Sequence, residues 1–413
     1  MIKNAIALLL LCASTLPATA QVKTLDKHCS TQFGKPSLRQ TIVIVDGSVV
    51  TADTANGPSA ENTGWRRFAA QFFDARNPNI DQIMAPRERI TVAVANSDGS
   101  GVTPLFTGCI PTFSKDEAAE LDRDTSSIQT FFGSDWRSAA KDAAEDFSRT
   151  ATISLVQGLK SAKIGVSQNR SAFAAGGLIQ SLSRAKSYAL SNGLPRVIVY
   201  SDLSAYEFPV ADTATARAKG RGDGETSGLD LQRAEVNIFS TGTAVGDGAA
   251  DYLRSFFLAS KGKVETIAGD GGSVGSNGVP VAVSVYQGAI TLAGNQYPVR
   301  MRLASDQNGT VTMSWVEEQS DRTRFVPFSG ILNCEDGSNC NYVGDRVFAQ
   351  IWADQAGAAP SCEGWMPFGG LRELVFKTQG EELSGRISDA TCVIVGEDNG
   401  LEFSLKRVQN AAF

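Results

Sequence analysis

The clearest pattern in the chain is a pair of apolar runs that lie far apart and end in the same way. Residues 41–46 and 196–202 are rich in valine and isoleucine, and the runs end on Asp46 and Asp202. An apolar run without polar alternation predicts a strand that is buried on both faces, as in a parallel sheet covered by helices. The two runs therefore predict two central strands, each with an aspartate at its carboxyl end.

The segments around these runs predict further strands and helices in alternation. The short turn-rich loop between 88–95 and 103–110 makes those two strands an antiparallel hairpin. The polar, glycine-rich stretch 209–232 predicts a mobile loop. The order of elements predicts a doubly wound α/β sheet flanked by helices, with one antiparallel edge strand. The other expected elements are strands at 235–240 and 263–268, and helices at 61–75, 136–159, 172–190 and 248–260.

The hydrophobic period changes after a glycine- and serine-rich stretch at 269–278. Such a composition is typical of a flexible connection between domains. We place an α/β domain at 21–270, a linker at 271–279 and a β-rich domain at 280–413. Short alternating segments with turn residues between them predict an antiparallel β-sandwich or a small barrel for this last domain. The expected strands are 281–286, 289–292, 299–304, 311–316, 346–352, 371–377, 383–386, 392–395 and 401–406.

The first 20 residues have the pattern of a secretory signal peptide. Lys3 precedes an apolar core at 5–11, and residues 18–20 form a cleavage site of small residues. No later stretch reaches the ~20 apolar residues of a membrane-spanning helix. We therefore expect an exported protein, periplasmic or extracellular, without an integral membrane segment after cleavage of the signal.

Charge and histidine content exclude two classes of function. The formal net charge is −6 and the basic residues are scattered, which argues against a nucleic-acid partner. The chain holds a single histidine, His28, so a zinc site built from several histidines is excluded. Because His28 precedes the first long strand, we expect a solvated surface residue without a catalytic role.

The cysteine count indicates disulfide bonds. An even number of cysteines in an exported chain favours disulfides over a metal site. Several pairings are possible, and we favour 29–109, 334–340 and 362–392 because each keeps both partners within one domain. The six cysteines that follow the signal peptide are Cys29, Cys109, Cys334, Cys340, Cys362 and Cys392.

Hydroxyl side chains accompany both strand-terminal aspartates. Ser48 follows Asp46, and Ser201 and Ser204 flank Asp202. Carboxylate and hydroxyl oxygens are the hard ligands that suit Mg²⁺ or Ca²⁺. Ligand sites in parallel sheets lie just beyond the carboxyl ends of the strands. The alternative is that the two aspartates only cap the loops and helices that follow their strands.

The region from about 38 to 270 resembles a von Willebrand factor A domain, through its two aspartate strands, its antiparallel hairpin and its closing strand-helix-strand unit. Domains of this family carry a metal-ion-dependent adhesion site. Its motif is Asp-x-Ser-x-Ser, a threonine on a middle loop and a later aspartate. Asp46, Ser48 and Asp202 match, while Val50 replaces the second serine. Ser171 is the nearest match to the threonine, with Ser167 as an alternative. The resemblance implies a degenerate site for Mg²⁺, Ca²⁺ or Mn²⁺; the β-rich domain resembles no family.

These observations predict an exported, non-enzymatic binding protein. Its α/β domain would engage a protein partner through the carboxyl edge of the sheet, with a divalent cation that a partner carboxylate completes. One alternative is a degenerate domain that serves as a scaffold without metal. The other is a Mg²⁺-dependent phosphoryl hydrolase, which is disfavoured because Asp46-Gly47-Ser48 supplies one carboxylate and no lysine follows a strand end.

Overall fold

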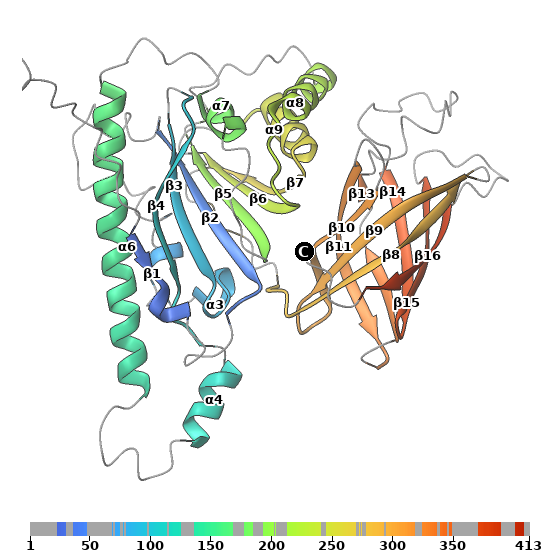
Figure 1. Cartoon of the computed structure of the whole chain (residues 1–413), viewed down its shortest axis with the longest axis horizontal. Coiled ribbons are helices and arrows are strands. Elements are labelled where there is room, and N and C mark those ends of the chain that lie inside the picture. The colour runs from blue at the N-terminus through green and yellow to red at the C-terminus, as the bar shows by residue number, and fades with distance from the viewer. Residues whose placement is uncertain are drawn as a thin grey trace, which may run out of the picture.

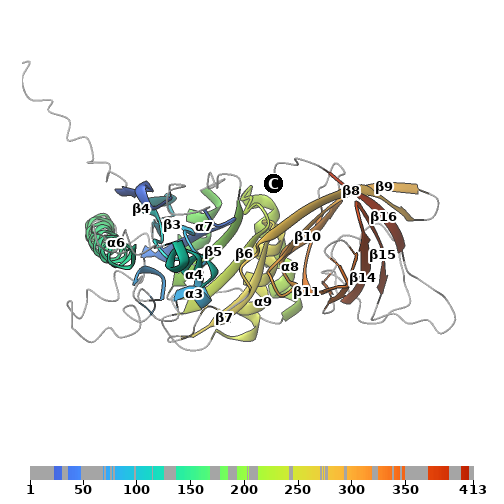
Figure 2. The same cartoon turned by 90° about the horizontal axis from the view of Figure 1, so that it is seen from below.

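The fold is described from a computed structural model (Figures 1 and 2). The described residues are 23–29, 36–47, 68, 71–74, 77, 80–96, 99–113, 115–124, 136–167, 177–184, 193–201, 203, 213–240, 245–269, 272, 274, 278–292, 295–318, 324–336, 339–344, 347–348, 371–389 and 401–408. The expected signal peptide lies outside these ranges.

The first two thirds of the chain form a mixed seven-stranded sheet. The strands are β1 (Lys23–Leu25), β2 (Arg39–Asp46), β3 (Arg89–Ala95), β4 (Val102–Cys109), β5 (Leu194–Ser201), β6 (Ala234–Ser240) and β7 (Gly262–Ala268). Their order is β1-β4-β3-β2-β5-β6-β7. All neighbours are parallel except β3 and β4, which form the expected antiparallel hairpin. The prediction that this hairpin ends the sheet is wrong, because β1 pairs with β4 and forms the edge.

Helices cover both faces of this sheet, as the double burial of the strands requires. One face buries Val43 and Val45 of β2 against Phe147 of α6 (Trp136–Ser167). The opposite face buries Ile42 and Ile44 against α7 (Gly177–Arg184), α8 (Thr213–Ser227) and α9 (Asp247–Ala259). Figure 1 shows α6 along one side of the sheet, with α7, α8 and α9 on the other. Of the helix expected at 61–75, residues 68 and 71–74 are described; residues 68 and 71–73 are helical and residue 74 is not.

Two shorter helices flank the sheet, and one helix replaces a predicted loop. The short ones are α3 (Ile80–Ile83) and α4 (Lys115–Asp124), in stretches for which the sequence predicted no element. The prediction of a mobile loop at 209–232 is wrong, because α8 spans most of these residues. A Cβ at Gly220 would lie 2.3 Å from the backbone oxygen of Tyr252, and one at Gly224 would lie 2.6 Å from that of Phe256. The glycines therefore bring α8 close to α9 rather than loosen the chain.

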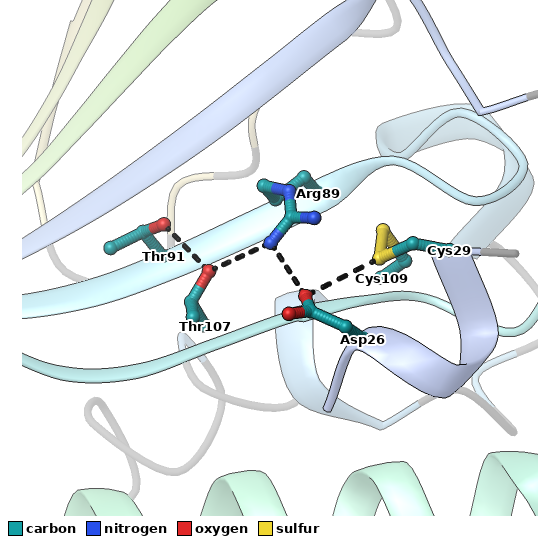
Figure 3. The surroundings of a disulfide bond; sticks show 6 residues. All are labelled: Asp26, Cys29, Arg89, Thr91, Thr107 and Cys109. Carbon is teal, nitrogen blue, oxygen red and sulfur yellow. Dashed lines mark hydrogen bonds and ion pairs between the residues drawn. A yellow bond between two sulfur atoms is a disulfide. The ribbon is translucent and has the colours of Figure 1, made fainter. Parts of the chain in front are cut away.

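A disulfide fixes the short strand β1 and the 3₁₀ helix η1 (Asp26–Cys29) to the sheet. Cys29 is bonded to Cys109 at the end of β4, as predicted. Arg89 of β3 forms an ion pair with Asp26 at 2.8 Å (Figure 3). His28 is buried, with 3% exposure, so the prediction of a solvated histidine is wrong. The reason is that η1 packs against β4 instead of leading freely into the first long strand.

The last third of the chain forms an antiparallel barrel, which decides between the sandwich and the barrel. Eight strands close the ring through a pairing of β12 with β14, and β13 adds to β14 outside the ring. The sequence analysis predicted no strand at the positions of β11 and β12. It predicted two strands, 281–286 and 289–292, where the structure has the single strand β8. The strands of this sheet are β8 (Ala282–Leu292), β9 (Asn295–Ser305), β10 (Thr310–Glu318), β11 (Arg324–Cys334), β12 (Asn339–Gly344), β13 (Val347–Phe348), β14 (Leu371–Gln379), β15 (Glu382–Asp389) and β16 (Leu401–Arg407).

Alternate barrel residues point inward and fill the interior. Tyr342 and Phe376 stack with ring centroids 4.5 Å apart, and Phe328 meets both rings edge-on. The predicted bridge between Cys334 and Cys340 joins the ends of β11 and β12. Cys362 and Cys392, and the strand predicted at 392–395, lie outside the described residues. Across the described chain, no helix is long and apolar enough to cross a membrane.

The barrel contacts the sheet domain at the amino ends of β5, β6 and β7. Arg233, which precedes β6, pairs with Glu317 of β10 and lies 4.8 Å from the ring centroid of Trp315. Arg302 lies 5.4 Å from the same ring and donates to the backbone oxygen of Arg233 at 3.2 Å. Further contacts are Lys263 on Ser329, and the apolar cluster of Leu194, Ala304 and Met313.

Candidate functional site at the carboxyl edge of the sheet

The order of the strands places a topological switch point between β2 and β5. The chain leaves β2 for β3 and β4 on one side of it, and then returns to β5 on the other side. In open α/β sheets, ligands bind beyond the carboxyl ends of the two strands that flank such a reversal. The two apolar runs identified in the sequence are β2 and β5. The fold therefore places the ends of both runs at the position where sheets of this kind bind ligands.

Small polar residues form a row at this edge. Asp46 ends β2, and the register of the parallel strands places Ser201 of β5 and Ser240 of β6 beside it in turn. Ser201 Oγ donates a hydrogen bond to Asp46 Oδ2 at 2.5 Å. All three residues are buried. Sequence reasoning named Asp46 and Ser201 but missed Ser240, although β6 ends on it.

The burial of Asp46 has a chemical consequence. A carboxylate taken out of water is costly unless hydrogen bonds or a charge compensate it. The hydroxyl of Ser201 supplies one hydrogen bond, and the set of carboxylate and hydroxyl oxygens is of the kind that hard divalent cations bind. The donor chemistry at the end of β2 therefore fits the ion that the resemblance implies.

The structure places one of the four predicted metal ligands. Asp46 is at the carboxyl edge, while Ser48, Ser171 and Asp202 lie outside the described residues. Within the described ranges, no three acidic, histidine or cysteine side chains gather in a way that would hold a metal ion. The convergence of the four predicted ligands stays a prediction, and Ser201, the neighbour of Asp202 in sequence, is in place beside Asp46.

The opposite edge of the sheet holds a second polar cluster, which the sequence analysis missed. Glu88 is fully buried between Arg39 at 3.0 Å and Arg196 at 3.2 Å. The backbone N–H of Ala85 donates to Glu88 Oε2 at 2.7 Å, and Thr41 Oγ1 donates to Glu88 Oε1. Charged residues at the starts of otherwise apolar strands are the signal that would have revealed this cluster.

The charges of this second cluster stabilise one another. Burial favours the neutral form of Glu88, but the adjacent Arg39 and Arg196 outweigh it and lower the pKa of this carboxyl. Burial and the nearby Arg39 lower the pKa of Arg196 to about 10, so Arg196 stays cationic at neutral pH. Both guanidinium groups also donate to the backbone oxygen of Ile83, each at 2.8 Å. This arrangement ties the segment before β3 to the sheet and is structural.

Comparisons with known proteins identify no family. No protein-family model matches the chain, and no curated protein matches it. Among solved structures, the human COPII-coat protein Sec24c is similar over 93% of this chain and 45% of its own, with 10% identity and a TM-score of 0.25. The chain thus spans less than half of that protein. This degree of likeness establishes no relationship, and the resemblance to von Willebrand factor A domains stays a prediction.

Proposed function

We propose that this protein is an exported, non-enzymatic binding protein that engages a protein partner at the carboxyl edge of its seven-stranded sheet. The observation that carries the proposal is the buried Asp46, which receives a hydrogen bond from Ser201 at the switch point between β2 and β5. The arrangement of β2, the β3–β4 hairpin, β5 and the β6-α9-β7 unit agrees with the element order on which the von Willebrand factor A resemblance rests.

A divalent cation would strengthen this interaction. Asp46, Ser48, Ser171 and Asp202 would supply its oxygen ligands, and water would replace the hydroxyl that is missing at Val50, since Mg²⁺ commonly keeps several waters. A carboxylate of the partner would complete the coordination. Disulfides at Cys29–Cys109 and Cys334–Cys340 agree with an oxidising, exported location.

The position of the barrel supports the same site. Its contacts with the sheet involve Leu194, Arg233 and Lys263, all at the amino ends of their strands. The carboxyl ends of those strands point away from this interface, because parallel strands share one direction. The barrel would therefore hold the sheet from one end while the other end meets the partner.

Titration of the mature chain with Mg²⁺, Mn²⁺ and Ca²⁺ by calorimetry tests the proposal, with thermal melting as a second readout. We expect at least one of these ions to bind and raise the melting temperature, since a ligand that binds only the folded state stabilises it. Asp202→Asn should abolish both effects. Asp142→Asn, on the exposed surface of α6, is the matched control and should keep them. If wild type binds none of the three ions, the metal-dependent site is rejected, and the alternative of a scaffold domain without metal is favoured.

A further inference from the structure

The outer face of the barrel carries a row of exposed aliphatic residues. Ile331 of β11 lies directly opposite Val343 of β12. Continuing the β12–β14 register by one residue places Val375 opposite Val343. These residues are 52%, 60% and 52% exposed, respectively. Neighbouring strands therefore align three exposed aliphatic side chains, whereas an isolated exposed valine would need no explanation.

This aliphatic row borders a groove with both polar and apolar lining residues. The groove has a volume of about 1140 Å³, and Val375 lines it. The register of β12, β14, β15 and β16 gives it two parallel rows of side chains, one with Asn341, Lys377, Ser384 and Ser404, the other with Val375, Arg386 and Glu402. Strands β14, β15 and β16 lie on the side of the barrel that faces away from the seven-stranded sheet (Figures 1 and 2). The groove is thus separate from both the barrel–sheet contact and the carboxyl edge.

The charges in the groove favour an anionic group. Arg386 lies directly across from Glu402, and the two charges offset each other. The side chains across from Lys377 are Asn341 and Ser384, which carry no charge. Lys377 therefore offers an ammonium group among amide and hydroxyl groups, in a chain whose net charge is −6.

We propose that this face of the barrel is a second binding surface, which takes an extended peptide segment of a protein partner. An acidic side chain of the segment would pair with Lys377, and aliphatic side chains of the segment would cover the row of Val375, Val343 and Ile331. The aliphatic row favours a peptide over a saccharide, because the aromatic rings that line the groove, on Tyr342, Phe376 and Phe403, are buried toward the barrel core.

A displayed library of random 12-residue peptides, selected on the immobilised mature chain, tests this surface. We expect the enriched sequences to combine aspartate or glutamate with valine, leucine or isoleucine. The affinity of an enriched peptide, measured by fluorescence anisotropy, should fall about fivefold in Lys377→Gln and weaken with added salt. It should fall about tenfold in Val343→Ser, which removes apolar contact area. Lys406→Gln is the matched control, because Lys406 is exposed on β16 outside the groove, and it should bind as wild type.

Four outcomes would overturn the proposal. The first is a lack of enrichment above the unselected library, and the second is enriched peptides that bind Lys377→Gln and Val343→Ser as tightly as wild type. The third is peptide binding that occurs only after removal of residues 349–370, which would mean that the chain covers its own groove. The fourth is a concentration-dependent dimer, seen by sedimentation, that Val343→Ser dissociates. Asp202→Asn should leave peptide binding unchanged, so failure at the carboxyl edge and failure at the groove are distinguishable.

Discussion

The two edges of the seven-stranded sheet bury polar groups in different ways. At the amino edge, Glu88 is held by two guanidinium groups, a hydroxyl and a backbone N–H, all from within the domain. At the carboxyl edge, Asp46 lies beside hydroxyl groups at the switch point of the sheet. Removing one member of a buried charge cluster such as that of Glu88 is strongly destabilising, whereas the carboxylate and hydroxyl oxygens at the carboxyl edge are of the kind that hard divalent cations bind.

The amino edge is also where the rest of the molecule is attached. The bond between Cys29 and Cys109 lies there, because Cys109 pairs with Arg89 at the start of β3. The barrel contacts the same edge through Arg233. We therefore expect the amino edge to contribute stability and propose that the carboxyl edge binds a partner, and the following predictions test that division.

The largest expected effect comes from the amino edge. Glu88→Gln should lower the free energy of unfolding by about 5 kcal/mol, because two buried guanidinium groups lose their counter-charge. Urea denaturation followed by circular dichroism measures the loss. Glu120→Gln, on the exposed surface of α4, is the control and should change stability by less than about 0.5 kcal/mol. A loss for Glu88→Gln no larger than that of the control would contradict the structural role of the cluster.

The same variant makes a prediction about pH. The pKa of Glu88 is lower in the folded protein than its ordinary value of 4.5. Its charged form therefore stabilises the fold above that value, and this contribution is lost as the pH falls through the lower, folded-state pKa. Wild-type stability should decline in this acidic range, and Glu88→Gln should decline less steeply. Equal slopes of unfolding free energy against pH for the two proteins would contradict this prediction.

The disulfide at the amino edge gives the next largest effect. Cys29 and Cys109 are 80 residues apart in sequence, and Cys334 and Cys340 only 6. If loop-closure entropy dominates, replacing the first pair by serine should cost about 4 kcal/mol, and replacing the second about 2 kcal/mol. Denaturation of the two double variants under identical oxidising conditions measures the difference. A larger loss for the barrel pair would contradict the loop-closure explanation and this ranking of the two bridges.

The contact between the barrel and the amino edge should contribute less. Arg233→Ala removes a cation–π contact with Trp315 and an ion pair with Glu317, and should cost about 1–2 kcal/mol. Arg254→Ala is the matched control, since Arg254 lies on the exposed surface of α9. Hydrogen exchange should show faster exchange at the start of β6 and the end of β10 in Arg233→Ala only. Unchanged exchange at both places would mean that the barrel is held by other contacts.

What the sequence predicted follows from how local each signal is. The buried strands β2 and β5 and the β3–β4 hairpin were predictable, because a run of contiguous residues indicates strand burial and a short connection indicates a hairpin. The helix α8 was not, since its glycines indicate a loop until Gly220 and Gly224 are seen against α9. The pairs Lys219–Asp223 and Arg221–Glu225, four residues apart, were the local signal that favoured a helix there.

The two polar clusters show the same limit. The position of Asp46 at the end of a buried strand was predictable, because an aspartate that ends an apolar run stands out in a single segment. Glu88 acquires its role only when Arg39 and Arg196, distant in sequence, converge on it. In the barrel, β11 contains Pro327 and Gly330 within eleven residues, and these interrupted the alternation that marks a strand.

An effect on stability as small as that of Arg233→Ala is expected at the carboxyl edge itself. Ser201→Ala removes the hydrogen bond to Asp46 Oδ2 and should cost about 1–2 kcal/mol, because a buried carboxylate loses a donor. Ser240→Ala, one strand away in the same buried row, is the matched control.

If the carboxyl edge is a binding site, Ser201→Ala should also weaken the response of the melting temperature to Mg²⁺ more than Ser240→Ala does, because it is the hydroxyl of Ser201 that orients Asp46. Calorimetric melting of both variants with and without Mg²⁺ measures the two quantities together. A stability loss as large as that of Glu88→Gln, with an unchanged response to Mg²⁺, would make the carboxyl edge a structural cluster like its opposite and remove the distinction between the two ends of the sheet.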